Sequence, residues 1–304
     1  MGAWSGPLAM RIIVQLDWLF AEEVGTSVIS RLHEVMPEQQ ESNHSFTMTV
    51  PDGDPRLGRV LSVLADAGLV RGTDRFRVRD RTREYALRYR REYDDSDLRL
   101  CELLELLPTG HVYRQSHGVL PHSIGLGVPE DLYGFQAEYI NPDIDFGHIG
   151  SGCPVFVPGR VARVLEHADL QGLTFRRVVL QVLQWHSNEV GYHDVPWDTY
   201  GEPWRQICAG PEMPPVSPYL KRCHGATGAP VPRESRGGII IEEGFADREL
   251  HYLRSEVSRM PAFDIARLFE SGGEGPFVVS RKFYDVCQQH GLRCGWRPVR
   301  IDED

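Results

Sequence analysis

Hydrophobic positions in the first third of the chain follow two periods, which predicts alternating strands and helices. Residues 12–16 form an apolar, β-branched run, and residues 45–50 also have the pattern of a strand. Apolar residues recur at helical spacing over residues 24–35 and 57–65, and the second of these helices is expected to stop near Gly68. The pattern therefore predicts an α+β region that covers residues 1–92.

An arginine-rich segment closes this region. Nine arginines lie between residues 71 and 91, and over residues 75–79 and 85–90 they alternate with apolar residues. A period of two places the arginines on one face of half-buried strands, and the acidic residues among them dilute their charge. A solvated strand face is therefore favoured over a surface that binds nucleic acid.

Two further helices and a strand are predicted downstream of residue 92. Asp94, Asp95 and Asp97 have the acidic, capping character of a helix start, and a helix over the leucines of residues 98–107 is predicted to follow. Residues 246–258 carry apolar residues at helical spacing and are also predicted to be helical. Residues 237–241 are predicted to form a buried strand.

Residues 277–301 repeat the pattern of residues 156–180. Each segment opens with a Phe-Val strand end, continues through a helix that begins near an arginine, and ends in an aromatic–Arg–x–Val strand. We therefore predict a duplicated strand–helix–strand unit. The corresponding pairs are Phe156/Phe277, Arg160/Arg281, Leu165/Val286, Phe175/Trp296, Arg176/Arg297 and Val178/Val299, together with Leu170/Leu292 after a slip of one residue.

Eight prolines lie between the two copies, over residues 196–232. Proline lacks the N–H that a central strand needs, so this stretch is expected to be a long connection. The predicted fold class is α+β or α/β mixed, with the duplicated unit built around mixed sheets and an additional N-terminal α+β region. The expected regions are residues 1–92, 93–195 with the first copy, 196–236 as the connection, and 237–304 with the second copy.

Composition and charge narrow the class of protein. The chain has 304 residues, of which 41% are hydrophobic, and a formal net charge of −10 at pH 7. Such a chain can bury a substantial core, and its acidity disfavours nucleic acid or an anionic membrane and favours a basic partner. The six cysteines include no C-x-x-C pair, no apolar stretch approaches the ~20 residues of a membrane span, and the first residues lack a signal-peptide pattern. We therefore expect a cytoplasmic protein.

The residues that could bind a metal or act in catalysis lie mainly in the irregular segment 109–153. His117, His122, His148 and Cys153 offer imidazole and thiolate groups that suit zinc, although their spacing matches no zinc motif. The chain contains neither a phosphate-binding glycine motif nor a G-x-S-x-G nucleophile elbow. The favoured interpretation therefore includes no catalytic residue and no cofactor. The alternative is a metal-dependent or Cys/His-dependent hydrolase with its site in this segment.

Two stretches of the sequence resemble a known family. The first is YALRYRREYD at residues 85–94 with the Asp97-Leu98 that follows it, and the second contains FVVSR, GL and WRPV within residues 277–299. They resemble bacterial immunity proteins of polymorphic toxin systems, notably the double-CXXCG-motif family. Both C-x-x-C-G elements of that family are absent here, so the resemblance brings no zinc site with it. It implies a fold type and a protein that binds and neutralises a cognate toxin.

The residues expected to bind this partner are acidic and aromatic. Acidic side chains would steer a basic toxin, and aromatic side chains would anchor it. The candidates are Asp94, Asp95, Asp97, Asp143, Asp145, Trp197, Tyr200 and Trp204.

Overall fold

The computed structural model describes residues 11–19, 22–37, 45–71, 84–112, 133–136, 140–148, 154–186, 189–199, 201–224, 229–236, 239–242, 249–270 and 276–304. The chain divides into two compact units, Met1–Asp97 with Glu242–Arg248 and Leu98–Ile241 with Glu249–Asp304. The fold is mixed α+β with three mixed sheets, which confirms the predicted class. Among the described residues, no helix is both long and apolar enough to cross a membrane.

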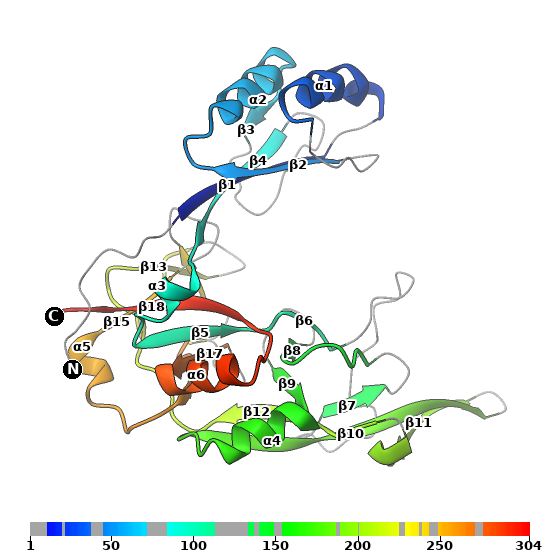
Figure 1. The fold of residues 1–304 in the computed structure, drawn as a ribbon, viewed down its shortest axis with the longest axis vertical. Helices are drawn as coiled ribbons and strands as arrows, with labels where there is room; N and C mark the ends of the chain where they lie inside the picture. Colours follow the sequence, from blue (N-terminus) through cyan, green and yellow to red (C-terminus); the bar gives the residue numbers. More distant parts are fainter. Residues whose placement is uncertain are drawn as a thin grey trace. The chain divides into compact units, whose positions relative to one another are not determined.

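In the first unit, two helices cover one face of a four-stranded sheet of order β2-β1-β4-β3 (Figure 1). Alternate residues of β1 explain this layering, because Val14, Leu16 and Trp18 are fully buried in the core shared with the helices. Gly68, with a φ of 77°, follows the end of α2 at the predicted position. The strands predicted over residues 12–16 and 45–50 and the helices predicted over residues 24–35 and 57–65 are confirmed. Their bounds are β1 (Arg11–Leu19), α1 (Glu22–Val35), β2 (Ser45–Pro51), α2 (Pro55–Asp66), β3 (Val70–Arg71) and β4 (Glu84–Glu92).

Strand β4 shows the alternation predicted for the arginine-rich segment. Tyr85, Leu87 and Tyr89 pack against the core shared with the helices. Arg88 lies on the opposite face, where its Nη1 is 3.3 Å from Asp17 Oδ2 of β1. Residues 72–83, with the other predicted arginine strand, lie outside the described residues.

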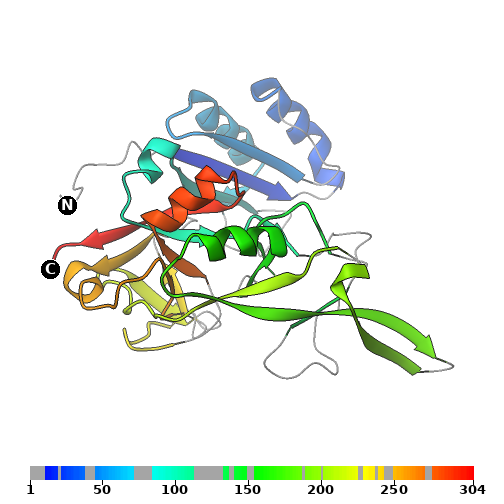
Figure 2. The ribbon, with the colours of Figure 1, turned by 60° about the horizontal axis from the view of Figure 1, so that its bottom comes forward.

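The second unit contains a seven-stranded and a five-stranded sheet. The first has the order β11-β10-β12-β9-β8-β6 with β7 also paired to β10, and the second has the order β15-β18-β5-β17-β16. The β10–β11 hairpin extends beyond the other strands of its sheet (Figure 1 and Figure 2). The strands are β5 (Leu103–Leu107), β6 (Gly110–His111), β7 (Tyr133–Gln136), β8 (Gly147–His148), β9 (Val155–Pro158), β10 (Leu173–His186), β11 (Glu189–Val195), β12 (Trp204–Ala209), β15 (Leu250–Leu253), β16 (Ile265–Arg267), β17 (Phe277–Ser280) and β18 (Gly295–Asp302). The remaining elements of this unit are α4 (Gly159–His167), α5 (Arg254–Val257), α6 (Arg281–Gln289), the 3₁₀-helix η2 (Trp197–Thr199), and β13 (Lys221–His224) paired with β14 (Ile239–Glu242). The short helix α3 (Asp95–Leu98) spans the sequence boundary between the two units.

The two segments with the repeated sequence pattern have the same topology. β9, α4 and β10 form a strand–helix–strand unit in which the antiparallel β12 lies between the two strands. β17, α6 and β18 form another, in which the antiparallel β5 takes that place. Each helix has nine residues, and the second residue after each helix has a positive φ, 48° at Asp169 and 61° at Gly291. A common origin by duplication stays a prediction.

The leucine-rich segment after Asp97 is a strand, and the helix predicted there is wrong. Helix α3 ends at Leu98 after one turn, and Leu103–Leu107 forms β5 in the middle of the five-stranded sheet. Its leucines are buried on both faces of the sheet, so the run has no alternation to mark it as a strand. A short apolar run of this kind fits a buried strand and a buried helix equally well. The helix predicted over residues 246–258 is replaced in the same way, because β15 and the one-turn α5 occupy residues 250–257.

The proline-rich stretch contains a central strand, which also differs from the prediction. β12 lies between β9 and β10, and its six residues include no proline. Pro203 and Pro211 flank it, so proline limits the ends of this strand without preventing its pairing. β5 and β12 each join strands that are distant in the sequence. For this reason one compact unit, Leu98–Ile241 with Glu249–Asp304, includes parts of all three regions predicted after residue 92.

Candidate functional site

The acidic turn at residues 94–97 stabilises the start of α3. Asp94 Oδ1 accepts hydrogen bonds from Ser96 Oγ at 2.5 Å and from Asp97 N at 2.9 Å, and these two hydrogen bonds lower the pKa of Asp94. Asp97 is 3% exposed and accepts a hydrogen bond from Asp94 N at 3.2 Å. Asp97 is therefore not a contact residue as predicted, because its carboxylate is buried and hydrogen-bonded within the protein. Asp94 and Asp95 are exposed.

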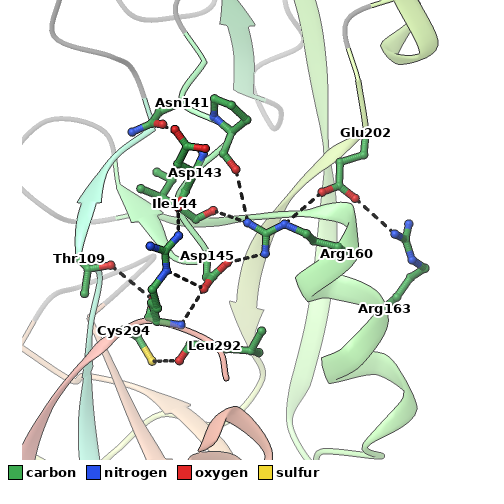
Figure 3. A network of polar contacts seen from close by, with 12 residues as sticks. Thr109, Asn141, Asp143, Ile144, Asp145, Arg160, Arg163, Glu202, Leu292 and Cys294 are labelled. Atoms are coloured by element: carbon green, nitrogen blue, oxygen red, sulfur yellow. Dashed lines mark hydrogen bonds and ion pairs between the residues drawn. The ribbon is translucent and has the colours of Figure 1, made fainter. Parts of the chain in front are cut away.

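Asp145 lies at the centre of a polar network that joins α4 to the turn after α6 (Figure 3). Its side chain is only 6% exposed. Oδ1 accepts a hydrogen bond from Arg160 Nη1 of α4, and Oδ2 accepts one from Arg293 N at 2.7 Å. Arg160 also donates to Ile144 O at 3.2 Å, and its Nε is 3.6 Å from Glu202 Oε1. Both carboxylate oxygens of Asp145 thus accept hydrogen bonds within the protein. The predicted contact with a partner is therefore corrected: Asp145 stabilises the fold.

Asp143 contributes to the same network through its backbone. Its carbonyl oxygen accepts a hydrogen bond from the Arg293 guanidinium, and its N–H donates to Asn141 Oδ1 at 3.1 Å. Asp143 itself is exposed. Of the two aspartates expected to bind a partner in this segment, Asp143 is therefore the one at the surface.

A second aspartate makes the reciprocal connection between the two strand–helix–strand units. Asp264 Oδ2 accepts a hydrogen bond from Gln171 N, in the turn after α4, at 2.8 Å, and it lies 3.5 Å from Lys282 Nζ of α6. Asp145 joins the start of α4 to the turn after α6, whereas Asp264 joins the start of α6 to the turn after α4. The two helices consequently lie side by side and run in opposite directions (Figure 2).

The sequence contains a signal for this pair that the prediction missed. Residues 142–148 are Pro-Asp-Ile-Asp-Phe-Gly-His, and residues 261–267 are Pro-Ala-Phe-Asp-Ile-Ala-Arg. In both segments a proline stands three residues before an aspartate with an apolar residue on each side, and a small and then a basic residue come two and three positions after the aspartate. Each segment leads into a short strand, β8 or β16, that pairs antiparallel with the first strand of the following unit. Extending the repeat toward the N-terminus would therefore have indicated both aspartates.

Cys294 lies near this network but has the properties of an inert thiol. Burial raises the pKa of the Cys294 thiol well above its usual range, and a hydrogen bond with Cys287 raises it further. Because the thiolate is the nucleophilic form, a raised pKa keeps the thiol protonated and slow to react.

The zinc candidates are only partly described by the structure. His148 of β8 packs against His111 of β6, with ring centroids 4.3 Å apart and ring planes tilted by 45°. His117, His122 and Cys153 lie outside the described residues. Within the part of the chain that the structure describes, no group of three or more His, Cys, Asp or Glu side chains could hold a metal ion. The zinc alternative therefore stays a prediction.

Trp197 and Trp204 meet in one aromatic cluster, and Tyr200 lies outside the described residues. The ring of Phe135 is 6.4 Å from that of Trp197 and 5.8 Å from that of Trp204, between centroids. Trp204 is 3% exposed, so its expected role as a surface anchor is corrected to that of a core residue. Trp197 is half-buried, and its Nε1 donates to Val178 O at 2.9 Å.

The two tryptophans line a hollow of about 420 Å³ that contains two arginines. The hollow is formed by residues 177–180 of β10 and by residues 194–197 and 203–205 on either side of the β11–β12 connection. Arg177 of β10 is directly opposite Arg205 of β12 in the strand register. Among the described residues, neither guanidinium makes a hydrogen bond or an ion pair. No pattern in the sequence marks this pair, because it depends on the register of two strands that are distant in the sequence.

Comparisons with known proteins do not assign the chain to a family. No protein-family model matches the chain, and no curated protein sequence matches it. The geometry of the described residues therefore carries the functional interpretation.

Proposed function

We propose that this protein binds another protein and neutralises it in the cytoplasm without catalysis, as the resemblance to bacterial immunity proteins implies. The observation that supports this best is the hollow beside Trp197, where Arg177 and Arg205 face each other without a counter-ion among the described residues. Tryptophan and arginine are enriched among the residues that dominate the free energy of protein–protein binding, and these residues typically lie in desolvated pockets. The hollow therefore has the composition of a recognition site for a protein.

The net charge supports a partner that is basic overall. A protein of net charge −10 attracts a basic toxin at long range, which raises the rate of association. The exposed Asp94 and Asp95 of the first unit, and the exposed Asp143 of the second, each remain candidates for contact with the toxin on this ground. The two arginines of the hollow are positively charged, opposite in sign to the net charge of the protein. A basic partner that places a carboxylate against them binds more tightly than a basic partner that does not, which gives specificity.

The two aspartate clamps support a scaffold that is organised before binding. Asp145 and Asp264 each tie one strand–helix–strand unit to the other through buried carboxylates. A surface that is fixed in advance loses less conformational entropy when it binds a partner. The clamps therefore favour binding without requiring a chemical step.

Co-expression with the toxin tests the proposal. The C-terminal toxin domain of a large secreted protein encoded beside this gene should arrest growth when expressed alone, and growth should resume when this protein is co-expressed. An unrelated acidic protein of similar size and net charge is the control and should not restore growth. Growth arrest that persists beside the folded protein would contradict neutralisation.

The mass of the toxin distinguishes binding from catalysis. After incubation with the purified protein, the toxin should keep its intact mass, because the proposal includes no covalent change. A cleaved or otherwise altered toxin would favour the hydrolase alternative with its site in residues 109–153.

A further inference from the structure

We propose that Arg177 and Arg205 together hold the carboxylate of an aspartate or glutamate side chain of the partner protein. The proposal rests on the proposed function, because it names the chemistry by which the same protein recognises its partner. It assigns a binding role to two arginines that no sequence motif marks.

The arrangement of these arginines is unfavourable in the free protein. Residues directly opposite each other on antiparallel strands have Cβ atoms about 4.5–5.5 Å apart, and like charges at such positions are destabilising. The five-stranded sheet shows the favourable alternative, because Arg297 of β18 lies directly opposite Glu105 of β5 and pairs with it at 3.1 Å. A carboxylate bound between Arg177 and Arg205 would supply the counter-ion that this second pair lacks among the described residues.

The walls of the hollow fix its shape. Arg205 is half-buried and Arg177 is exposed, and the hollow is also lined by Trp197, Pro203 and Trp204. The half-buried guanidinium of Arg205 is less screened by water than an arginine on an open surface, so its pair with a carboxylate is stronger. Trp204 is fixed in the core, and the indole N–H of Trp197 is bound to the backbone of β10. The walls are therefore in place before a partner arrives.

The chemistry and the size of the hollow define the occupant. A guanidinium binds a carboxylate through parallel N–H···O hydrogen bonds, and two guanidinium groups can satisfy both oxygens of one carboxylate. A volume of about 420 Å³ is near the lower end of ligand sites, which span about 300–1,000 Å³, so one side chain fits better than a folded element.

Asp194 also lines the hollow but does not neutralise the arginines. Its Oδ1 accepts a hydrogen bond from Gln181 Nε2 at 3.0 Å. Within the described part of the chain, it forms no ion pair with either arginine.

Binding measurements on neutral variants test the proposal. Arg177→Gln and Arg205→Gln, titrated by calorimetry against the purified toxin domain, should each raise the Kd by about 10- to 100-fold. The double variant should be only slightly weaker than either single variant, because one carboxylate needs both arginines. Arg205→Lys keeps the charge but loses the planar fork, so its Kd should be intermediate. Arg259→Gln replaces an exposed arginine of the same unit and should leave the Kd unchanged.

Thermal unfolding separates an effect on binding from an effect on folding. Removing one of two facing like charges should leave the melting temperature of the protein unchanged or raise it. The partner carboxylate is then located by replacing each Asp and Glu of the toxin domain with Asn or Gln. Replacement of the contacting residue should weaken binding to wild type but not to Arg205→Gln.

The outcomes distinguish this proposal from the proposed function. If wild type binds the toxin domain and the double variant binds it equally well, the arginine proposal fails and the function stands. If wild type does not bind the toxin domain, both fail. Coupling of Arg205 to the C-terminal carboxylate of the toxin, or displacement of the toxin by inorganic phosphate at constant ionic strength, would also overturn the proposed occupant.

Discussion

Asp145→Asn keeps the shape of a buried side chain and removes its charge, so it tests the clamp between α4 and the turn after α6. Hydrogen bonds to a charged group contribute about 1.5–3 kcal/mol each, and removing one partner of a buried ion pair costs about 3–5 kcal/mol. The Arg160 and Arg293 side chains are 41% and 71% exposed, so water replaces part of what they lose. We therefore expect the free energy of unfolding of the second unit to fall by about 2–3 kcal/mol.

Differential scanning calorimetry measures this loss as a lower melting temperature. For a unit of this size, the expected loss lowers the melting temperature by roughly 5–10 °C. Asp285→Asn is the matched control on α6, since Asp285 pairs with Arg281 at 2.8 Å on the surface and is 58% exposed. Its removal should cost about 0.3–0.5 kcal/mol. An equal loss in the two variants, or a loss below about 0.5 kcal/mol for Asp145→Asn, would refute the clamp.

Three further predictions follow from buried groups and from the zinc alternative. Burial raises the pKa of the Cys294 thiol, so iodoacetamide at pH 8 should alkylate it at least about 10-fold more slowly in the folded protein than in urea. Mass spectrometry follows the alkylation, and similar rates in the two states would contradict the raised pKa. Gln206 is 1% exposed, and among the described residues neither polar atom of its amide has a hydrogen-bond partner. Gln206→Met should therefore raise the free energy of unfolding by about 1 kcal/mol in urea denaturation, and a lower free energy of unfolding would contradict this reasoning. Protein purified without chelators should contain no stoichiometric zinc by elemental analysis, and zinc that is lost in His148→Ala would favour the hydrolase alternative.

The first unit could be predicted from the sequence because each of its main elements buries one face. In β1 the buried Val14, Leu16 and Trp18 alternate with less buried residues, and α1 and α2 each bury one side against them. Periods of two and of about 3.6 residues are therefore visible in the sequence. In β5 the leucines are buried on both faces, so the period disappears and strand and helix cannot be told apart.

The candidate site was harder to predict because its parts are brought together by long-range pairing. Arg177 and Arg205 are 28 positions apart, and only the register of β10 against β12 places them opposite each other. Residue type alone also failed to separate surface from interior. Asp145 and Trp204 were expected to contact a partner, yet each is buried by interactions within the protein.

The central claim is that the protein neutralises its toxin by forming a stable complex, and titration of toxin activity tests it most directly. The activity of a fixed amount of toxin domain should fall linearly as the protein is added and reach zero near one equivalent, at toxin concentrations well above a Kd of about 1 μM or lower. The inhibited toxin should recover its activity after the complex is dissociated in denaturant and refolded alone. Undiminished activity at a large molar excess of folded protein, or loss of activity at far less than one equivalent, would contradict neutralisation by binding.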